Sequence, residues 1–183
     1  MKKFLIIGNA NAITNKDIFP HIAGGEVFIS TKDGVTNFTM HFKTPDGEKT
    51  ASALWYTNLD SRHLYKGLNL TKEYSPEEYP KYGNYDAIDV GCVKNIPVNY
   101  DGVMGVPISV LLYDLEGYEI VGCPEANVLP DGWRGMTKEF VDLYYSQGNK
   151  GHYQEQHRFA YYVTNEGMAK VPYKRILIKK IIE

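Results

Sequence analysis

Few side chains in this sequence stand at spacings that could carry out chemistry by themselves. Asp86 and Asp89 flank Ala87-Ile88 and could serve catalysis, although the same pattern fits any strand edge. The glycine-rich phosphate motifs and the GxSxG nucleophile motif do not occur. Cys92 and Cys123 lack metal-site spacing and are too few for a disulfide framework. The five histidines lie in separate segments: His21, His41, His63, His152 and His157. These residues alone predict no self-sufficient active site and no metal centre.

The composition favours a folded protein without choosing its ligand. The chain has 183 residues, of which 43% are hydrophobic, and this excludes disorder of the whole chain. Fifteen tyrosines are an unusual number. Because tyrosine joins apolar area to a polar tip, they predict either a tyrosine-rich core or a surface that stacks on a ligand. No apolar run approaches a membrane span and no signal peptide is recognised, so a cytoplasmic protein without a membrane partner is expected.

Charge is distributed unevenly along the chain. The net charge is −2, which excludes a strongly basic nucleic-acid coat protein. Residues 149–183 nevertheless hold seven Lys and Arg against three Glu, a net charge of +4, so residues 1–148 carry −6. The basic part predicts either a solvated terminal strand or an edge that faces phosphates.

The elements that must position these side chains are mostly strands. The apolar run of Lys2–Ile7, followed by a Gly/Asn turn, is typical of a central parallel strand in an α/β sheet. A helix is expected over Ala12–Ile22, bent or ended early by Pro20. A second, short helix is expected over Thr137–Tyr145. Further strands are expected at Glu26–Ser30, Val35–Phe42, Ser52–Thr57, Ala87–Val90, Val106–Leu112, Tyr118–Val121 and Tyr173–Ile182, with turns at 32–34 and 44–47.

Five ordered blocks of the sequence are too unusual to be generic. They are residues 2–14 (KKFLIIGNANAIT), 55–60 (WYTNLD), 79–88 (YPKYGNYDAI), 96–108 (IPVNYDGVMGVPI) and 172–179 (PYKRILIK). In this order they closely resemble the C-terminal half of the EcoRI-type adenine-specific DNA methyltransferases. The resemblance runs from residue 2 to about residue 180, and it is patchy between 25 and 50 and between 113 and 170.

The resemblance implies an α/β fold: a partial Rossmann-like methyltransferase sheet made of its C-terminal strands, with β-rich, loop-rich target-recognition insertions. We therefore expect a single domain over residues 1–183, with a loop-rich recognition segment at 60–110 and a divergent insertion at 134–171. Members of this family transfer a methyl group from S-adenosylmethionine to N6 of adenine in duplex DNA. Double-stranded DNA is accordingly the expected partner.

The catalytic motif of the family is missing from this chain. Its Asn-Pro-Pro-Phe motif lies just upstream of the strand that Lys2–Ile7 matches, and its cofactor-binding segment lies further upstream. The motif positions an amino group that is a poor nucleophile, so its loss should abolish methyl transfer. Consequently no catalytic residue is assigned here, and binding of S-adenosylmethionine by this chain alone is not expected.

Three functions are compatible with this absence. The leading one is the C-terminal half of a methyltransferase of a restriction-modification system, inactive alone and completed by a separate N-terminal catalytic half or by self-association. The alternative is a non-catalytic module that binds DNA or a partner protein. The third is a remnant without present activity.

The resemblance also implies residues for a base pocket and for DNA contacts. Asn9, Asn11 and Asn58 are candidates for the adenine pocket, because ligands bind at the C-terminal ends of strands in open α/β sheets. For Asn9 and Asn11, the alternative is that they satisfy the backbone of a turn. Candidates for DNA contacts are Arg62, His63, Lys66, Lys72, Lys81, Tyr82, Tyr85, Tyr100, Lys174 and Arg175. Exposed lysines are commonly only solvated, which is the competing interpretation for the basic residues between 62 and 72. For the candidates at 81–85 and at 100 it is packing shared with the family, and for residues 174 and 175 it is that they only flank the last strand.

Overall fold

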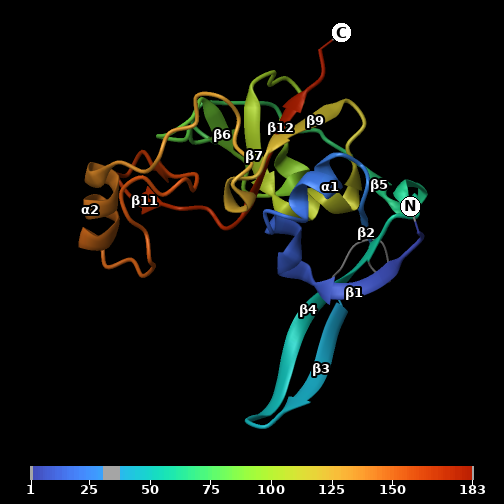
Figure 1. The fold of residues 1–183 in the computed structure, drawn as a ribbon. Helices are drawn as coiled ribbons and strands as arrows, with labels where there is room; N and C mark the ends of the chain where they lie inside the picture. The colour runs from blue at the N-terminus through green and yellow to red at the C-terminus, as the bar shows by residue number, and fades with distance from the viewer. Residues whose placement is uncertain (1, 31–37, 183) are drawn as a thin grey trace. The chain divides into compact units, whose positions relative to one another are not determined.

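The computed structural model describes residues 2–30 and 38–182 and shows a mixed α/β chain with several small sheets and short helices (Figure 1). The sequence predicts a single domain over residues 1–183. The structure has two compact units. The first comprises Met1–Leu68 and Leu111–Glu116, and the second comprises Asn69–Val110 and Gly117–Glu183. In the described ranges, no helix is both long and apolar enough to cross a membrane.

The first unit contains a small antiparallel sheet with β4 at its centre and a separate pair of parallel strands, β5 and β8. Its elements are β1 (Leu5–Asn9), the 3-10 helix η1 (Ala10–Thr14), α1 (Phe19–Ala23), β2 (Phe28–Ser30), β3 (Phe38–Thr44), β4 (Gly47–Thr57), the 3-10 helix η2 (Arg62–Leu64), β5 (Lys66–Gly67) and β8 (Tyr113–Asp114). The strand order is β1-β4-β2, and β3 pairs with the first part of β4. Ile6 and Ile29 both stand opposite Tyr56, which places this tyrosine in the middle of the sheet.

Strand β1 corrects a sequence-based prediction. It is antiparallel to β4, with Leu5 opposite Thr57, and it forms one end of the strand order instead of a central parallel strand. The continuous apolar run had suggested burial on both faces. Instead Leu5, Ile6 and Ile7 are 59%, 55% and 43% exposed. The prediction was wrong because, in the described part of the chain, no strand pairs with the outer edge of β1.

The helix expected over residues 12–22 forms only as η1 and α1. Asn15 ends η1 with an extended backbone, and its side-chain oxygen accepts a hydrogen bond from the Asp17 N–H at 2.8 Å. Such local hydrogen bonds compete with helix continuation. Pro20 lies in the first turn of α1, where its missing N–H costs no helical hydrogen bond.

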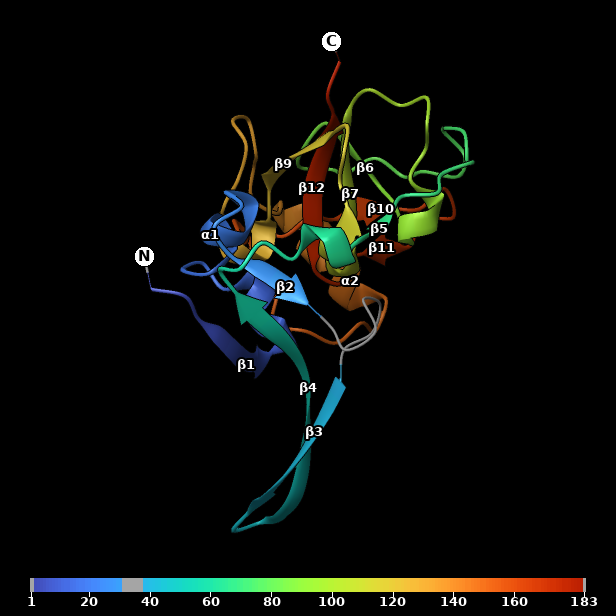
Figure 2. The ribbon, with the colours of Figure 1, turned by 90° about the vertical axis from the view of Figure 1, so that its right-hand side faces the viewer.

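Strands β3 and β4 form a long hairpin that extends beyond β1 and β2 in both views (Figures 1 and 2). The turn at 44–47 is confirmed: Gly47 has a φ of 120°, and the Thr44 hydroxyl donates to its carbonyl at 3.0 Å. The expected strand over Val35–Phe42 is found from Phe38 onward. Its first residues and the expected turn at 32–34 lie outside the described residues.

The second unit is built on a four-stranded sheet with the order β6-β7-β12-β9. Its elements are β6 (Ala87–Asp89), the 3-10 helix η3 (Val93–Asn95), β7 (Val103–Pro107), β9 (Tyr118–Gly122), the 3-10 helix η5 (Pro124–Ala126), α2 (Lys138–Ser146), β10 (Tyr162–Val163), β11 (Ala169–Lys170) and β12 (Arg175–Lys180). Within this sheet β6 and β7 are parallel, and the other pairs are antiparallel. The terminal strand is confirmed as β12, whose Ile176, Leu177 and Ile178 are fully buried.

Two elements of this unit show how local signals act. The expected strand over Val106–Leu112 stops at Pro107 and continues as the 3-10 helix η4 (Ile108–Leu112), which runs on into the first unit. Proline cannot donate a ladder hydrogen bond, which accounts for the stop. The helix expected over Thr137–Tyr145 is confirmed as α2. It begins after Thr137 because the Thr137 hydroxyl caps the helix by accepting a hydrogen bond from the Phe140 N–H at 3.2 Å.

The segment expected to diverge, residues 134–171, has a small core of its own. Phe140 of α2 stacks on Tyr161 with ring centroids 4.0 Å apart, and Met136 and Ala169 are buried against them. This packing gives the segment a defined backbone structure, which can hold its exposed side chains in fixed positions.

Candidate functional site

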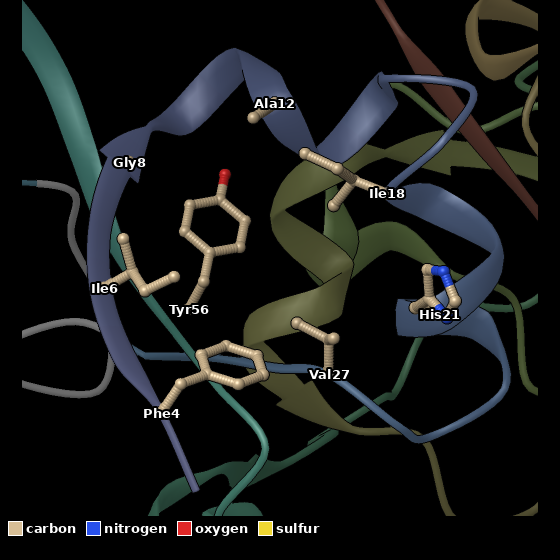
Figure 3. A pocket seen from close by; sticks show the side chains of 8 residues that line it. All are labelled: Phe4, Ile6, Gly8, Ala12, Ile18, His21, Val27 and Tyr56. Carbon is tan, nitrogen blue, oxygen red and sulfur yellow. The ribbon is translucent and has the colours of Figure 1, made fainter. Parts of the chain in front are cut away.

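An apolar hollow of about 270 Å³ lies beside β1 in the first unit (Figure 3). The Tyr56 ring points into it, with Phe4 and Ile6 on one side and Ile18 and Val27 on the other. The complete lining is Phe4, Ile6, Gly8, Ala12, Ile18, His21, Val27 and Tyr56. The hollow therefore suits an apolar side chain better than a polar ligand.

Tyr56 fixes the end of β1. Its hydroxyl donates to the Asn9 carbonyl at 2.8 Å, and burial raises the pKa of Tyr56 to about 12, so the hydroxyl stays a neutral donor. A Cβ at Gly8 would lie only 2.8 Å from the Tyr56 ring. Only glycine therefore allows this close approach of ring and strand.

The three base-pocket candidates lie on or beside β1 without lining the hollow. The Asn9 side chain accepts from the Asn11 N–H at 2.8 Å, and Asn11 itself is exposed. Asn58 accepts from the Phe4 N–H and donates to the Lys2 carbonyl, both at 2.9 Å. The geometry thus favours the alternative interpretation for Asn9, in which it satisfies a backbone group of the turn. The Asn58 side chain also satisfies backbone groups, which the sequence did not predict.

Arg62 is not free to contact DNA, because its guanidinium group is already hydrogen-bonded to Asp60. Its Nη2 lies 2.6 Å from Asp60 Oδ2, and its Nε lies 3.0 Å from Oδ1. These hydrogen bonds lower the pKa of Asp60 to about 2. His63 and Lys66, which follow, are exposed. A phosphate would have to compete with the Asp60 carboxylate for Arg62.

Tyr82 and Arg175 do not fit the predicted DNA contacts, because both are buried. Arg175 donates to Asp89 through Nε at 2.8 Å and through Nη2 at 3.2 Å, and the Tyr82 hydroxyl donates to Asp89 at 2.7 Å. A Cβ at Gly105 would collide with the Tyr82 hydroxyl, so Gly105 makes room for this cluster. The cluster joins β6 to β12, two strands that do not pair directly. Its role is structural.

The remaining candidates differ in their surroundings. Lys72 and Lys81 are exposed and pair with Glu78 and Asp86. The two tyrosines are half-buried in ring contacts: Tyr85 stacks on Trp133 at 5.1 Å, and Tyr100 lies 4.7 Å from Tyr74. Lys174, which is half-buried, has its Nζ over the Tyr173 ring. Much of the tyrosine content therefore serves packing.

Two arginines in the second unit were not among the sequence-based candidates. Arg134 and Arg158 are exposed, and in residues 2–30 and 38–182 neither guanidinium has an ion pair or a hydrogen bond. Their sequence signal is weak, because both lie in the segment where the family resemblance is patchy. Arg158 lines a second hollow, of about 450 Å³, together with Pro124, Glu125, Asn127, Gln156, His157 and Phe159.

The two cysteines should differ sharply in reactivity. Cys123 is buried, and burial together with the nearby Glu125 carboxylate raises the pKa of its thiol to about 12, whereas Cys92 is exposed. Because the thiolate is the reactive form, a thiol reagent at mildly alkaline pH should label one cysteine in the folded protein and both after denaturation. Peptide mapping should place the first label on Cys92, and Cys92→Ser should abolish it. Rapid labelling of both thiols would contradict the buried position of Cys123.

Comparison with known proteins shows the family of this chain. It belongs to the family described as adenine-specific methyltransferase EcoRI, whose model matches residues 1–181. Type II methyltransferase M.EcoRI of Escherichia coli is 40% identical over 138 residues, which cover 66% of this chain and 42% of that protein. Type II methyltransferase M.MgeORF184P of Mycoplasma genitalium is 33% identical over 141 residues, covering 67% and 44%.

A third relative, Type II methyltransferase M.MpnI of Mycoplasma pneumoniae, is 28% identical over 141 residues and shows the same coverage, 67% and 44%. The matched part of the chain thus spans less than half the length of these curated relatives. No solved structure matches the chain significantly. The family expected from the five sequence blocks is confirmed.

Proposed function

We propose that this chain is the DNA-recognition half of an adenine-N6 DNA methyltransferase of a restriction-modification system. The family membership and the three Type II relatives support methyl transfer as the reaction of the complete enzyme. The partial Rossmann-like sheet implied by the resemblance is part of the same proposal. Methyl transfer then needs a further segment that carries the Asn-Pro-Pro-Phe motif and the cofactor site.

The exposed edge of β1 is the observation that carries this proposal. Leu5, Ile6 and Ile7 are consecutive, apolar and exposed, and the apolar hollow opens beside them. Exposed apolar strand edges invite pairing with another strand. A strand of the catalytic segment added at this edge would cover the three side chains and place an apolar residue in the hollow. Self-association through the same edge is the competing arrangement.

S-adenosylmethionine does not fit the hollow beside β1. The cofactor has an ammonium group, a carboxylate and a ribose diol, which all require polar partners. The lining offers the His21 imidazole, which already lies 2.8 Å from Glu26, and the Tyr56 hydroxyl, which already donates to the Asn9 carbonyl. We therefore assign the cofactor to the catalytic segment and derive no step through it here.

Reconstitution with a catalytic segment tests the proposal. The chain alone should bind duplex DNA in a salt-dependent manner without transferring a methyl group. Addition of the N-terminal segment of the Escherichia coli relative, which contains the missing motif by resemblance, should produce transfer from labelled S-adenosylmethionine. Mass spectrometry of the digested duplex should find the label on N6 of adenine. Methyl transfer or cofactor binding by this chain alone would contradict the proposal that it is only the DNA-recognition half of the enzyme.

A non-catalytic DNA-binding module is the second candidate function. Arg134 and Arg158, exposed and without an ion-pair or hydrogen-bond partner among the described residues, favour it, because such guanidinium groups can bind DNA whether or not methyl transfer follows. Duplex binding by the chain, with no transfer in any mixture, would select this function over the first.

A further inference from the structure

Two segments of the second unit run side by side and are joined through their backbones. The Met136 N–H donates to the His157 carbonyl at 2.8 Å, and the Gln156 N–H donates to the Met136 carbonyl at 2.9 Å. The Trp133 indole N–H donates to the Arg158 carbonyl at 3.0 Å. Residues 133–136 and 156–159 therefore form one frame, although they lie far apart in the sequence.

Asn84 locks this frame from inside. The residue is only 1% exposed, and its Nδ2 donates to the Arg134 carbonyl and to the Phe159 carbonyl, both at 2.9 Å. The Asn84 backbone carbonyl in turn accepts from the Arg134 N–H at 3.1 Å. At Gly135 an added Cβ would lie 2.5 Å from Gln156 Cα, so the two backbones touch where glycine leaves room. One buried amide thus fixes the backbone that carries both arginines.

Two arginine side chains on this frame are available to bind a ligand. The chain has four arginines, and Arg62 and Arg175 are already held by Asp60 and Asp89. Arg134 and Arg158, the other two, are exposed, and in the described residues their guanidinium groups have no partner. Gln156, which lines the hollow with Arg158, has a φ of 67°, in the left-handed region that residues other than glycine and asparagine rarely adopt. Unusual backbone conformations of this kind gather at binding sites.

We propose that Arg134 and Arg158 bind paired acceptor atoms of duplex DNA, either guanine O6 and N7 in the major groove or phosphate oxygens. This inference rests on the proposed function, since it names the residues through which the recognition half holds DNA. The planar guanidinium matches both kinds of acceptor with two parallel hydrogen bonds. A locked backbone reduces the entropy lost on binding, so exposed side chains on this frame are well suited to recognition.

Substitutions at both arginines test the proposal and separate the two acceptors. Binding of the full chain to a pool of random duplexes is measured by fluorescence anisotropy, and the bound fraction is sequenced. The double variant Arg134→Ala with Arg158→Ala should bind at least about tenfold more weakly. If the arginines bind phosphates, the variant with Lys at both positions keeps the affinity, and the Ala variant lowers the salt slope by about 0.9 per lost contact. If they read guanine, the Lys variant loses base preference, because lysine lacks the planar fork.

The control is Lys138→Ala, which removes one exposed positive charge from the same unit and should leave binding unchanged. Thermal melting should show that all variants fold. Wild-type affinity and base preference in the double Ala variant would overturn this inference and leave the proposed function standing. Failure of the wild-type chain to bind any duplex would contradict the proposed function, and this inference with it.

Discussion

Replacing Arg175 with Met is expected to lower the free energy of unfolding by about 3–5 kcal/mol. The substitution leaves Asp89 buried without the two hydrogen bonds from Arg175 that now balance its charge. The Tyr82 hydroxyl, which also donates to Asp89, cannot neutralise a carboxylate by itself. The loss should appear as a lower midpoint of urea-induced unfolding.

Two further variants make this result specific to the buried pair. Combining Arg175→Met with Asp89→Leu removes both charges of the pair and should recover much of the lost stability, because the Asp89 carboxylate is then no longer buried without its partner. Arg62→Met breaks the exposed pair with Asp60 and should leave the midpoint almost unchanged. If Arg175→Met is as mild as Arg62→Met, the buried cluster does not hold β6 to β12.

Replacing Ile6 with Lys is expected to reduce methyl transfer by the reconstituted enzyme about a hundredfold. An unpaired ammonium group buried under the partner strand costs several kcal/mol. Each ~1.4 kcal/mol lowers the association constant of the two segments tenfold. Ile6 lines the apolar hollow, and the proposed partner strand would cover it. Because Ile6 is 55% exposed in this chain, the variant should still fold. Transfer is measured with both segments at fixed concentration.

The matched control for this variant is Leu64→Lys. Leu64 lies in the same unit and is 51% exposed, but it is neither in β1 nor in the lining of the hollow. It should leave transfer unchanged. Sedimentation of the chain alone shows whether β1 instead pairs with a second copy, and Ile6→Lys should then disperse the dimer. If the mixture with Ile6→Lys transfers methyl groups as fast as the wild-type mixture, the catalytic segment does not dock on β1.

Short-range patterns predicted several elements well. The apolar run near the C-terminus predicts β12, and the apolar spacing after Thr137 predicts α2. These signals succeed because an apolar run and a helix cap are formed by residues near in sequence. The helix over residues 12–22 failed for a local reason as well: the Asn15 turn interrupts it.

The family can be recognised from five ordered sequence blocks, and most of the local elements follow from short-range patterns. Which charged side chains lack a partner could be known only from the folded chain. Arg175 is buried because Asp89 lies opposite it, 86 residues away, whereas Arg134 and Arg158 are exposed on segments that Asn84 joins across 50 and 75 residues. The edge position of β1 also depends on its pairing with β4. The physical reason is that burial and ion pairing depend on long-range partners, which the type of a residue does not specify.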